Sequence, residues 1–261
     1  MRIVNDIIKE MESLAPTYLK EDFDNVGLMV GDRNKEVNKV LLALDCTLKV
    51  IEEAKREDVD LIITHHPLIF RKPSNITTDT LQGKKIIELI KNDISLYSSH
   101  TNLDSAINGL NHTIVCMLGF EESTILEKNK TVNSTGIGRI VKLDKEIKLE
   151  NLIEQVKRKL NISNLRVVKG NDTVSKIAII NGSGQDFIAK AMKLGVDTVI
   201  TGDTTYHFAS DYKEMGINIL DVGHFASEQI VFFNVMKQIE SKFDDIVFIE
   251  SKVEEDPFTF E

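Results

Sequence analysis

The sequence has no tryptophan, only two cysteines and only four prolines among its 261 residues. Cys46 and Cys116 lie far apart and form no CxxC motif, which excludes a disulfide framework and predicts free thiols in a reducing compartment. No run of about 18 apolar residues occurs, which excludes a transmembrane helix. Residues 1–14 mix charged and apolar side chains, as an amphipathic helix does and a signal peptide does not. We therefore expect a cytoplasmic protein that does not span a membrane.

Positive charge is also scarce, because 32 basic residues face 41 acidic ones and the formal net charge is -9. Nonspecific binding to a nucleic acid depends on clustered lysine and arginine that neutralise phosphates. The acidic balance makes nucleic acid an unexpected partner. With 42% hydrophobic residues, the chain can bury one large core or two smaller ones.

The chain alternates apolar runs with amphipathic helical patterns almost throughout. In the N-terminal half, the pattern predicts strands at 39–45, 59–64 and 94–99, with helices at 48–58, 81–92 and 105–118. In the C-terminal half, it predicts strands at 137–143, 165–170, 176–182, 197–202, 217–222 and 245–250, with helices at 149–160, 186–195, 206–215 and 227–243. This alternation is typical of βαβ units, so we expect an α/β fold with mainly parallel sheets. The polar stretch 121–136 is the best candidate for a domain boundary.

The histidines are the residues most able to carry chemistry. Only six occur, and four of them directly follow predicted strands. In open α/β sheets, ligands bind beyond the carboxyl ends of the strands. His65 and His66 come first, in the segment THHPLIF, where Pro67 favours an extended backbone at His66. Two imidazoles at a strand end suit metal binding, although capping or core-polar histidines would give the same pattern.

Two further segments place histidine near a carboxylate. In SSHTNLDS, His100 and Asp104 follow a predicted strand, and Asp104 could instead cap the helix that comes next. In GHFASEQ, His224 and Glu228 are four positions apart and share one helical face if the helix begins by His224. An ordinary solvated first turn with a favourable glutamate is the alternative for this segment.

Together, the three strand-end segments predict a metal site with nitrogen and oxygen ligands. Without thiolates, such a set favours zinc, manganese or iron. The number of candidate ligands exceeds what one catalytic metal needs, so two metals sharing a carboxylate fit better. The candidate ligands are His65, His66, Asp104, His224 and Glu228.

Other polar residues leave their roles open. Asp203, Tyr206 and His207 lie in a strand-to-helix turn, where Asp203 could support the site or, like Thr204, merely cap the helix. The segment NGSGQ, residues 181–185, could bring backbone amides to a phosphate, but a plain tight turn is the better interpretation. We expect His112 to pack inside a helix.

The chain resembles the NIF3-like family, also described as GTP cyclohydrolase 1 type 2 homologues. The matching motifs keep the family order over nearly the whole chain: DFDNVGLMVGD, LALDCT, THHPLIF, SHTNLDS, NGSG, TGDTTYH and GHFASEQ. The family often has Trp where Phe23 stands, and its longer members carry an inserted middle domain for which this chain has no room. Neither departure touches a ligand, and the family's metal ligands fall on the five residues named above.

The resemblance implies two α/β lobes of the NIF3-like kind. Residues 1–125 plus 222–261 would form the metal-binding lobe, and 126–221 the second lobe. It also implies a homohexamer and two divalent metal ions per chain. The implied activity is metal-dependent hydrolysis of a purine nucleotide, in which His100 or His207 could transfer protons. A metal carrier or insertase, or a regulatory partner protein without turnover, is the alternative.

Overall fold

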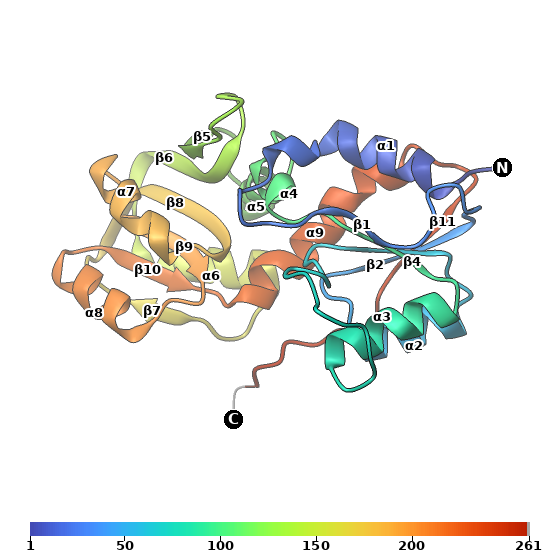
Figure 1. Cartoon of the computed structure of the whole chain (residues 1–261). Coiled ribbons are helices and arrows are strands. Elements are labelled where there is room, and N and C mark those ends of the chain that lie inside the picture. The colour runs from blue at the N-terminus through green and yellow to red at the C-terminus, as the bar shows by residue number, and fades with distance from the viewer. Residues whose placement is uncertain (260–261) are drawn as a thin grey trace. The chain divides into compact units, whose positions relative to one another are not determined.

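The computed structural model describes residues 1–259 and divides the chain into two compact units. Unit 1 comprises Met1–Ala106 and Phe232–Glu255, and unit 2 comprises Ile107–Val231 with the residues from Asp256 on (Figure 1). These bounds differ from the expected 1–125 plus 222–261 and 126–221. Residues 107–125 lie in unit 2 because they include helix α5 (Leu110–Leu118), which packs against strands of that unit.

Unit 1 contains a five-stranded sheet in the order β1-β4-β3-β2-β11. Its strands are β1 (Gly27–Val30), β2 (Lys39–Ala43), β3 (Leu61–Thr64), β4 (Ser95–Ser98) and β11 (Val247–Glu250). All neighbouring pairs are parallel except β1 with β4. The central strands are buried along their whole length because helices cover both faces, as is usual for parallel sheets. The expected parallel sheet is therefore present in unit 1, with β1 as an additional edge strand.

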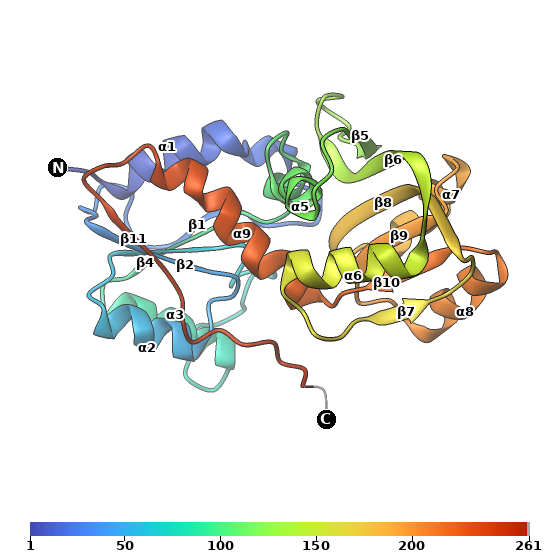
Figure 2. The same cartoon turned by 180° about the vertical axis from the view of Figure 1, so that it is seen from behind.

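Helices cover both faces of this sheet (Figures 1 and 2). Helix α1 (Val4–Leu14) and the part of α9 (His224–Glu240) from Phe232 on lie over one face. Helices α2 (Leu48–Arg56) and α3 (Leu81–Lys91) lie over the other, where Ile51 and Leu89 join the apolar side chains of the strands. Short 3-10 helix η1 (Thr17–Leu19) follows α1.

The segment after β4 folds differently from the predicted helix 105–118. It forms short helix α4 (Thr101–Ser105), an extended residue at Ala106, and then α5, which begins at Leu110. Asp104 therefore lies inside α4, and His100 occupies the N-cap position. The interpretation of Asp104 as a helix cap is wrong, since the N-cap residues of α4 and α5 are His100 and Gly109.

Unit 2 contains a six-stranded sheet in the order β5-β6-β8-β9-β10-β7. Its strands are β5 (Thr124–Lys128), β6 (Gly136–Lys148), β7 (Arg166–Val168), β8 (Thr173–Ser183), β9 (Thr198–Gly202) and β10 (Asn218–Asp221). Only β8, β9 and β10 pair in parallel, so the sheet is mixed and not mainly parallel. The polar stretch 121–136 contains edge strand β5, which pairs with β6.

Helices of unit 2 also lie on both faces of their sheet. Helices α5 and α6 (Leu149–Leu160) pack against β6 and β8. On the other face, Ile188 and Ala191 of α7 (Ile188–Lys193) and Tyr212 of α8 (Tyr206–Glu214) join the core. A short 3-10 helix, η2 (Gln185–Phe187), precedes α7. Helix α9 begins at His224, three residues before the predicted start at 227. Within residues 1–259, no helix has the length and apolar character needed to cross a membrane.

Candidate metal centre

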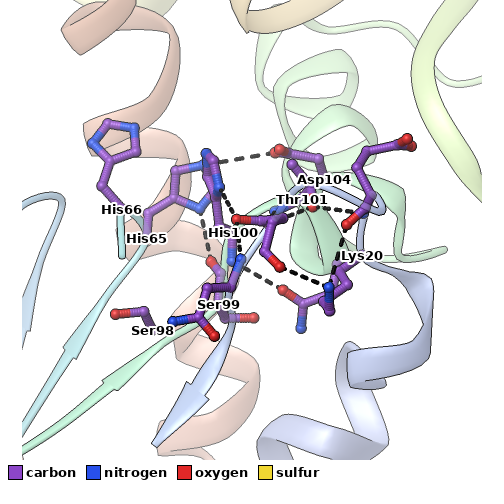
Figure 3. Close-up of polar contacts among 12 residues, drawn as sticks. Lys20, His65, His66, Ser98, Ser99, His100, Thr101 and Asp104 are labelled. Carbon is purple, nitrogen blue, oxygen red and sulfur yellow. Dashed lines mark hydrogen bonds and ion pairs between the residues drawn. The ribbon is translucent and has the colours of Figure 1, made fainter. Parts of the chain in front are cut away.

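Three histidines meet where the parallel strands β3 and β4 of unit 1 end. Thr64 and Ser98 are paired at the ends of these strands, so His65, His66 and His100 follow at the same edge of the sheet. The ring centroids are 5.1 Å apart for His65 and His66, 5.2 Å for His65 and His100, and 5.6 Å for His66 and His100. Each ring offers a nitrogen within 4.8 Å of the nitrogens of the other two, which is the reach of a single metal ion (Figure 3).

Each of these rings is oriented by a hydrogen bond from Nδ1 to an oxygen. Nδ1 of His65 lies 2.9 Å from the backbone oxygen of Ser99. Nδ1 of His66 lies 3.0 Å from Oδ1 of Asp45, and Nδ1 of His100 lies 2.9 Å from Oδ1 of Asp24. Because carbonyl and carboxylate oxygens only accept hydrogen bonds, Nδ1 is the donor in all three rings. A metal would then be bound through Nε2, the arrangement usual for metal-binding histidines.

Asp24 is a buried carboxylate that fixes His100. Its second oxygen accepts hydrogen bonds from the backbone N–H of Thr101, at 3.0 Å, and from the Thr101 hydroxyl. Burial alone would raise the pKa of Asp24, but the hydrogen bond and charge of His100, with the bonds from Thr101, lower that pKa to about 2. The carboxylate is thus ionised at neutral pH and holds the His100 ring in one orientation.

Asp45 serves His66 in the same way. Burial acts to raise its pKa, and the hydrogen bond and charge of His66 outweigh this, so the pKa of Asp45 lies below its ordinary value. The loop that carries it is held by Glu254, whose carboxylate accepts hydrogen bonds from the backbone N–H groups of Leu44 and Asp45, each at 2.8 Å. Burial raises the pKa of Glu254.

Asp104 brings a carboxylate to the same set. It is buried in α4, and its Oδ1 lies 3.7 Å from Nε2 of His65 (Figure 3). Short helix α4 begins directly after His100, so the two side chains come from adjacent turns of one segment. Unit 1 thereby offers three imidazoles and one carboxylate.

Unit 2 contains a second set of candidate ligands at the start of α9. Nδ1 of His224 lies 2.7 Å from Oδ2 of Asp203, and Nε2 of His224 lies 2.9 Å from Oε2 of Glu228. Because α9 begins at His224, the two residues are one turn apart on one face, as the sequence pattern required. Asp203 has a positive φ of 57°, a conformation rare outside glycine and enriched at functional sites. The Nδ1-to-carboxylate arrangement of unit 1 therefore recurs here.

The NGSG segment supports Glu228. Nδ2 of Asn181 donates to Oε1 of Glu228 at 3.1 Å, and the backbone N–H of Gly182 donates to Oγ of Ser227 at 3.0 Å. A Cβ atom at Gly182, where φ is +58°, would lie 2.3 Å from Oε1 of Glu228. Glycine at this position gives the buried carboxylate its space, which neither the phosphate-loop nor the tight-turn interpretation anticipates.

The other sequence candidates lie elsewhere. The ring of His207 contacts the neighbouring ring of Tyr206, and the two ring centroids are 5.5 Å apart. Neither Asp203 nor Thr204 caps α8, because the N-cap residue is Thr205. His112 lies inside α5, as expected, and is half-buried, with its Nε2 3.6 Å from Sγ of the exposed Cys116. Cys46 is buried, and burial raises the pKa of its thiol to about 12.

The structure adds residues for which the sequence suggested no role. Asp24 orients His100 from 76 positions away, and Asn181 holds Glu228 from 47 positions away. Their sequence signal is that they stand in two of the motifs that carry the family resemblance, DFDNVGLMVGD and NGSG. Every histidine in the two sets has its Nδ1 fixed by an oxygen, and the donors are nitrogen and oxygen only. This chemistry fits a divalent ion such as zinc, iron or manganese.

Comparisons with known proteins give concordant matches. The family model described as Duf34/NIF3 (NGG1p interacting factor 3) matches residues 2–257. The GTP cyclohydrolase 1 type 2 homolog of Clostridium perfringens is 58% identical over 259 residues, which cover 98% of this chain and 99% of the relative. A crystal structure of a Bacillus cereus protein related to NIF3 is 27% identical with a TM-score of 0.89, covering 100% of this chain and 99% of that one. Reduced HcgD from Methanocaldococcus jannaschii is 32% identical with a TM-score of 0.84, covering 95% and 97%.

Proposed function

Because the chain belongs to the Duf34/NIF3 family, we propose that it is a metal-dependent hydrolase acting on a purine nucleotide. In this proposal two divalent metal ions are bound by His65, His66, Asp104, His224 and Glu228. The observation that carries it is the common orientation of the imidazoles, each with Nδ1 held by an oxygen, so that Nε2 is the nitrogen that would bind a metal. The substrate class follows the name of the relatives, GTP cyclohydrolase 1 type 2 homolog.

The proposed reaction is hydrolytic opening of the imidazole ring of the base. One water molecule adds to the carbon between the ring nitrogens and opens the ring, and a second releases that carbon as formate, so no redox partner is required. A divalent metal acts as a Lewis acid that makes water a better nucleophile near neutral pH. Glu228 contributes a buried carboxylate one turn after the start of α9, where the side-chain amide of Asn181 donates a hydrogen bond to it.

His100 is the residue to which we assign proton transfer. Asp24 holds its Nδ1–H, so Nε2 can accept a proton from water and return it to a ring nitrogen of the base. Its ring lies 5.2 Å from that of His65 and 5.6 Å from that of His66, measured between centroids. His207 is the alternative proton-transfer residue. Its ring contacts that of Tyr206, whereas the ring of His100 is oriented by the carboxylate of Asp24.

The decisive experiment combines metal analysis with turnover. The protein is purified without oxygen, its metals are measured, and GTP ring opening is assayed after zinc, iron or manganese is restored. Glu228→Gln should lose metal and activity while keeping the fold, because it keeps the size but not the charge. His100→Ala should retain metal and lose turnover, and His112→Ala should change neither. Normal metal content with lowered stability in Glu228→Gln would show that Glu228 is only a helix-start charge.

A metal carrier is the second candidate function, and one observation favours it. The side chains of His66 and His224 are 22% and 35% exposed, so ligands of both units can be reached by solvent. A carrier should release its metal to a chelator within minutes, whereas a hydrolase should keep at least one ion. Metal loss in Glu228→Gln together with no turnover under any metal would favour the carrier.

We also propose, from the family resemblance, that the chain assembles as a homohexamer. Light scattering should give a mass six times the 29.4 kDa of one chain. A stable monomer across concentrations would contradict this.

A further inference from the structure

Two phenylalanines are exposed beside the histidines of unit 1. Phe23 is 67% exposed and Phe70 is 41% exposed, although both are large apolar side chains. Their ring centroids are 6.3 Å apart in an edge-to-face arrangement. A single exposed apolar residue is ordinary, but a pair of aromatic rings in mutual contact forms a local apolar surface. Such a surface needs an explanation that the metal ligands alone do not give.

The loops that carry the two rings are tied to each other and to His100. Phe23 stands between Asp24, which accepts the hydrogen bond from His100, and Asn25, whose Nδ2 donates to the backbone oxygen of Ile69 at 2.6 Å. Ile69 directly precedes Phe70, and the Phe70 ring lies 6.4 Å from the His100 ring between centroids, nearly perpendicular at 79°. Asp24 and Asn25 therefore tie the loops of Phe23 and Phe70 to each other, with the Phe70 ring next to the His100 imidazole.

We propose that Phe23 and Phe70 form a stacking site for the planar aromatic heterocycle of a small-molecule ligand. The identification of that heterocycle as a purine rests on the proposed function, but the stacking site itself does not. Aromatic side chains bind bases through their faces without reading hydrogen bonds, which suits two exposed apolar rings of which one, Phe70, contacts the His100 imidazole. The site gives a role to three of the four residues of the DFDN segment: Phe23 stacks, Asp24 orients His100, and Asn25 ties the second loop.

The residues after Phe70 extend the site towards a nucleotide. Arg71 and Lys72 are both exposed, and they form a local pair of positive charges in a chain whose net charge is -9. Phosphates attached to a stacked base would find cationic side chains on the same loop. A nucleoside and its triphosphate should therefore both bind, and the triphosphate should bind more tightly.

The absence of tryptophan makes the site directly measurable. Phe23→Trp keeps an aromatic ring at an exposed position and introduces the only tryptophan of the chain. Metal-free Phe23→Trp protein is titrated with guanosine and with GTP, with N-acetyltryptophanamide correcting for absorption by the ligand. Saturable quenching of fluorescence is expected. Phe70→Ala in the same background should weaken binding by about tenfold or more. Tyr18→Ala, which removes an aromatic ring that is 63% exposed and belongs to neither of the two loops, is the matched control and should leave the titration unchanged.

Three results would overturn the proposal. One is the absence of saturable quenching by either ligand in protein whose circular dichroism is normal. Another is equal quenching with and without Phe70. The third is blue-shifted emission that turns red on dilution to monomer, because the ring would then be covered by a second copy of the chain. If quenching saturates but GTP is never hydrolysed, the stacking site stands and the proposed function fails. If GTP is hydrolysed without quenching, only the stacking site fails.

Discussion

The two units bring different ligands to metal binding while using the same support. Unit 1 has two proposed imidazole ligands, His65 and His66, directly after strand β3, and one carboxylate, Asp104, in short helix α4. Unit 2 has one imidazole, His224, and the buried carboxylate of Glu228, both on the first turns of a long helix. In both units, an aspartate from a separate loop holds a histidine through Nδ1.

This difference indicates which contacts each set of ligands depends on. In unit 1 the positions of the ligand imidazoles depend on the oxygens that hold their Nδ1 atoms. In unit 2 the charge itself is buried, so it depends on space and on the hydrogen bond from Asn181. Variants of matched kind in the two units should therefore fail in different ways.

The largest expected effect is the loss of a whole metal ion. His65→Ala in unit 1 and His224→Ala in unit 2 should each reduce the bound metal by at least one ion per chain, because each removes a proposed ligand. Elemental analysis of metal-loaded protein makes the measurement. Only one tightly bound ion in the unaltered protein would contradict two-metal binding, and full occupancy in the variants would contradict the ligand assignment.

Gly182→Ala should cost up to about 3 kcal/mol of stability and weaken metal binding, because the new Cβ would lie 2.3 Å from Oε1 of Glu228. Gly216→Ala is the matched control in the same unit. It also has a positive φ, +79°, but nothing lies within 4 Å of the added atom. Both variants carry the backbone strain, so the difference in urea unfolding and metal content isolates the space needed by Glu228. Equal behaviour of the two variants would remove that role.

The aspartates behind the histidines should matter less than the ligands. Asp45→Asn in unit 1 and Asp203→Asn in unit 2 should each weaken metal binding by about 10- to 100-fold, the usual cost of losing such a supporting group. Competition with a chromophoric chelator measures the affinity. Asp79→Asn, which removes the charge of an exposed residue outside the two sets, should leave the affinity unchanged. Unaltered affinity in both test variants would show that the Nδ1 contacts are incidental.

The smallest expected effect is the loss of stability at acidic pH that comes from protonation of Asp24. Its pKa in the folded protein, about 2, lies below the ordinary 3.8, so the unfolded chain binds its proton more tightly. Asp24 thus contributes about 2 kcal/mol of stability above pH 4, and this contribution is lost as the pH falls from about 4 to 2. Asp24→Asn should flatten this part of the urea-unfolding profile. An unchanged slope between pH 4 and 3 would contradict the assignment.

Sequence reasoning reached the alternation of strands and helices and the metal-ligand candidates, because both rest on local patterns. An apolar run such as 61–64 can be recognised from the sequence alone, and so can the four-residue spacing of His224 and Glu228. The supporting roles of Asp24 and Asn181, and the need for space at Gly182, could not be predicted from the sequence. Their partners are 47 to 76 positions away, or are atoms that only the fold brings near. The mixed sheet of unit 2 was not predicted for the same reason, because β5 is a polar segment that becomes a strand only by pairing with β6.

The place of β11 has a consequence for synthesis. It lies in parallel beside β2, yet it is translated after every other strand of both sheets. The strands of unit 2 end with Asp221, so that sheet can form on the ribosome while one edge of β2 still waits for Val247–Glu250. An open strand edge invites pairing with other chains. Chains that stop short of Val247 should therefore aggregate during expression, even though they retain every residue proposed to bind metal.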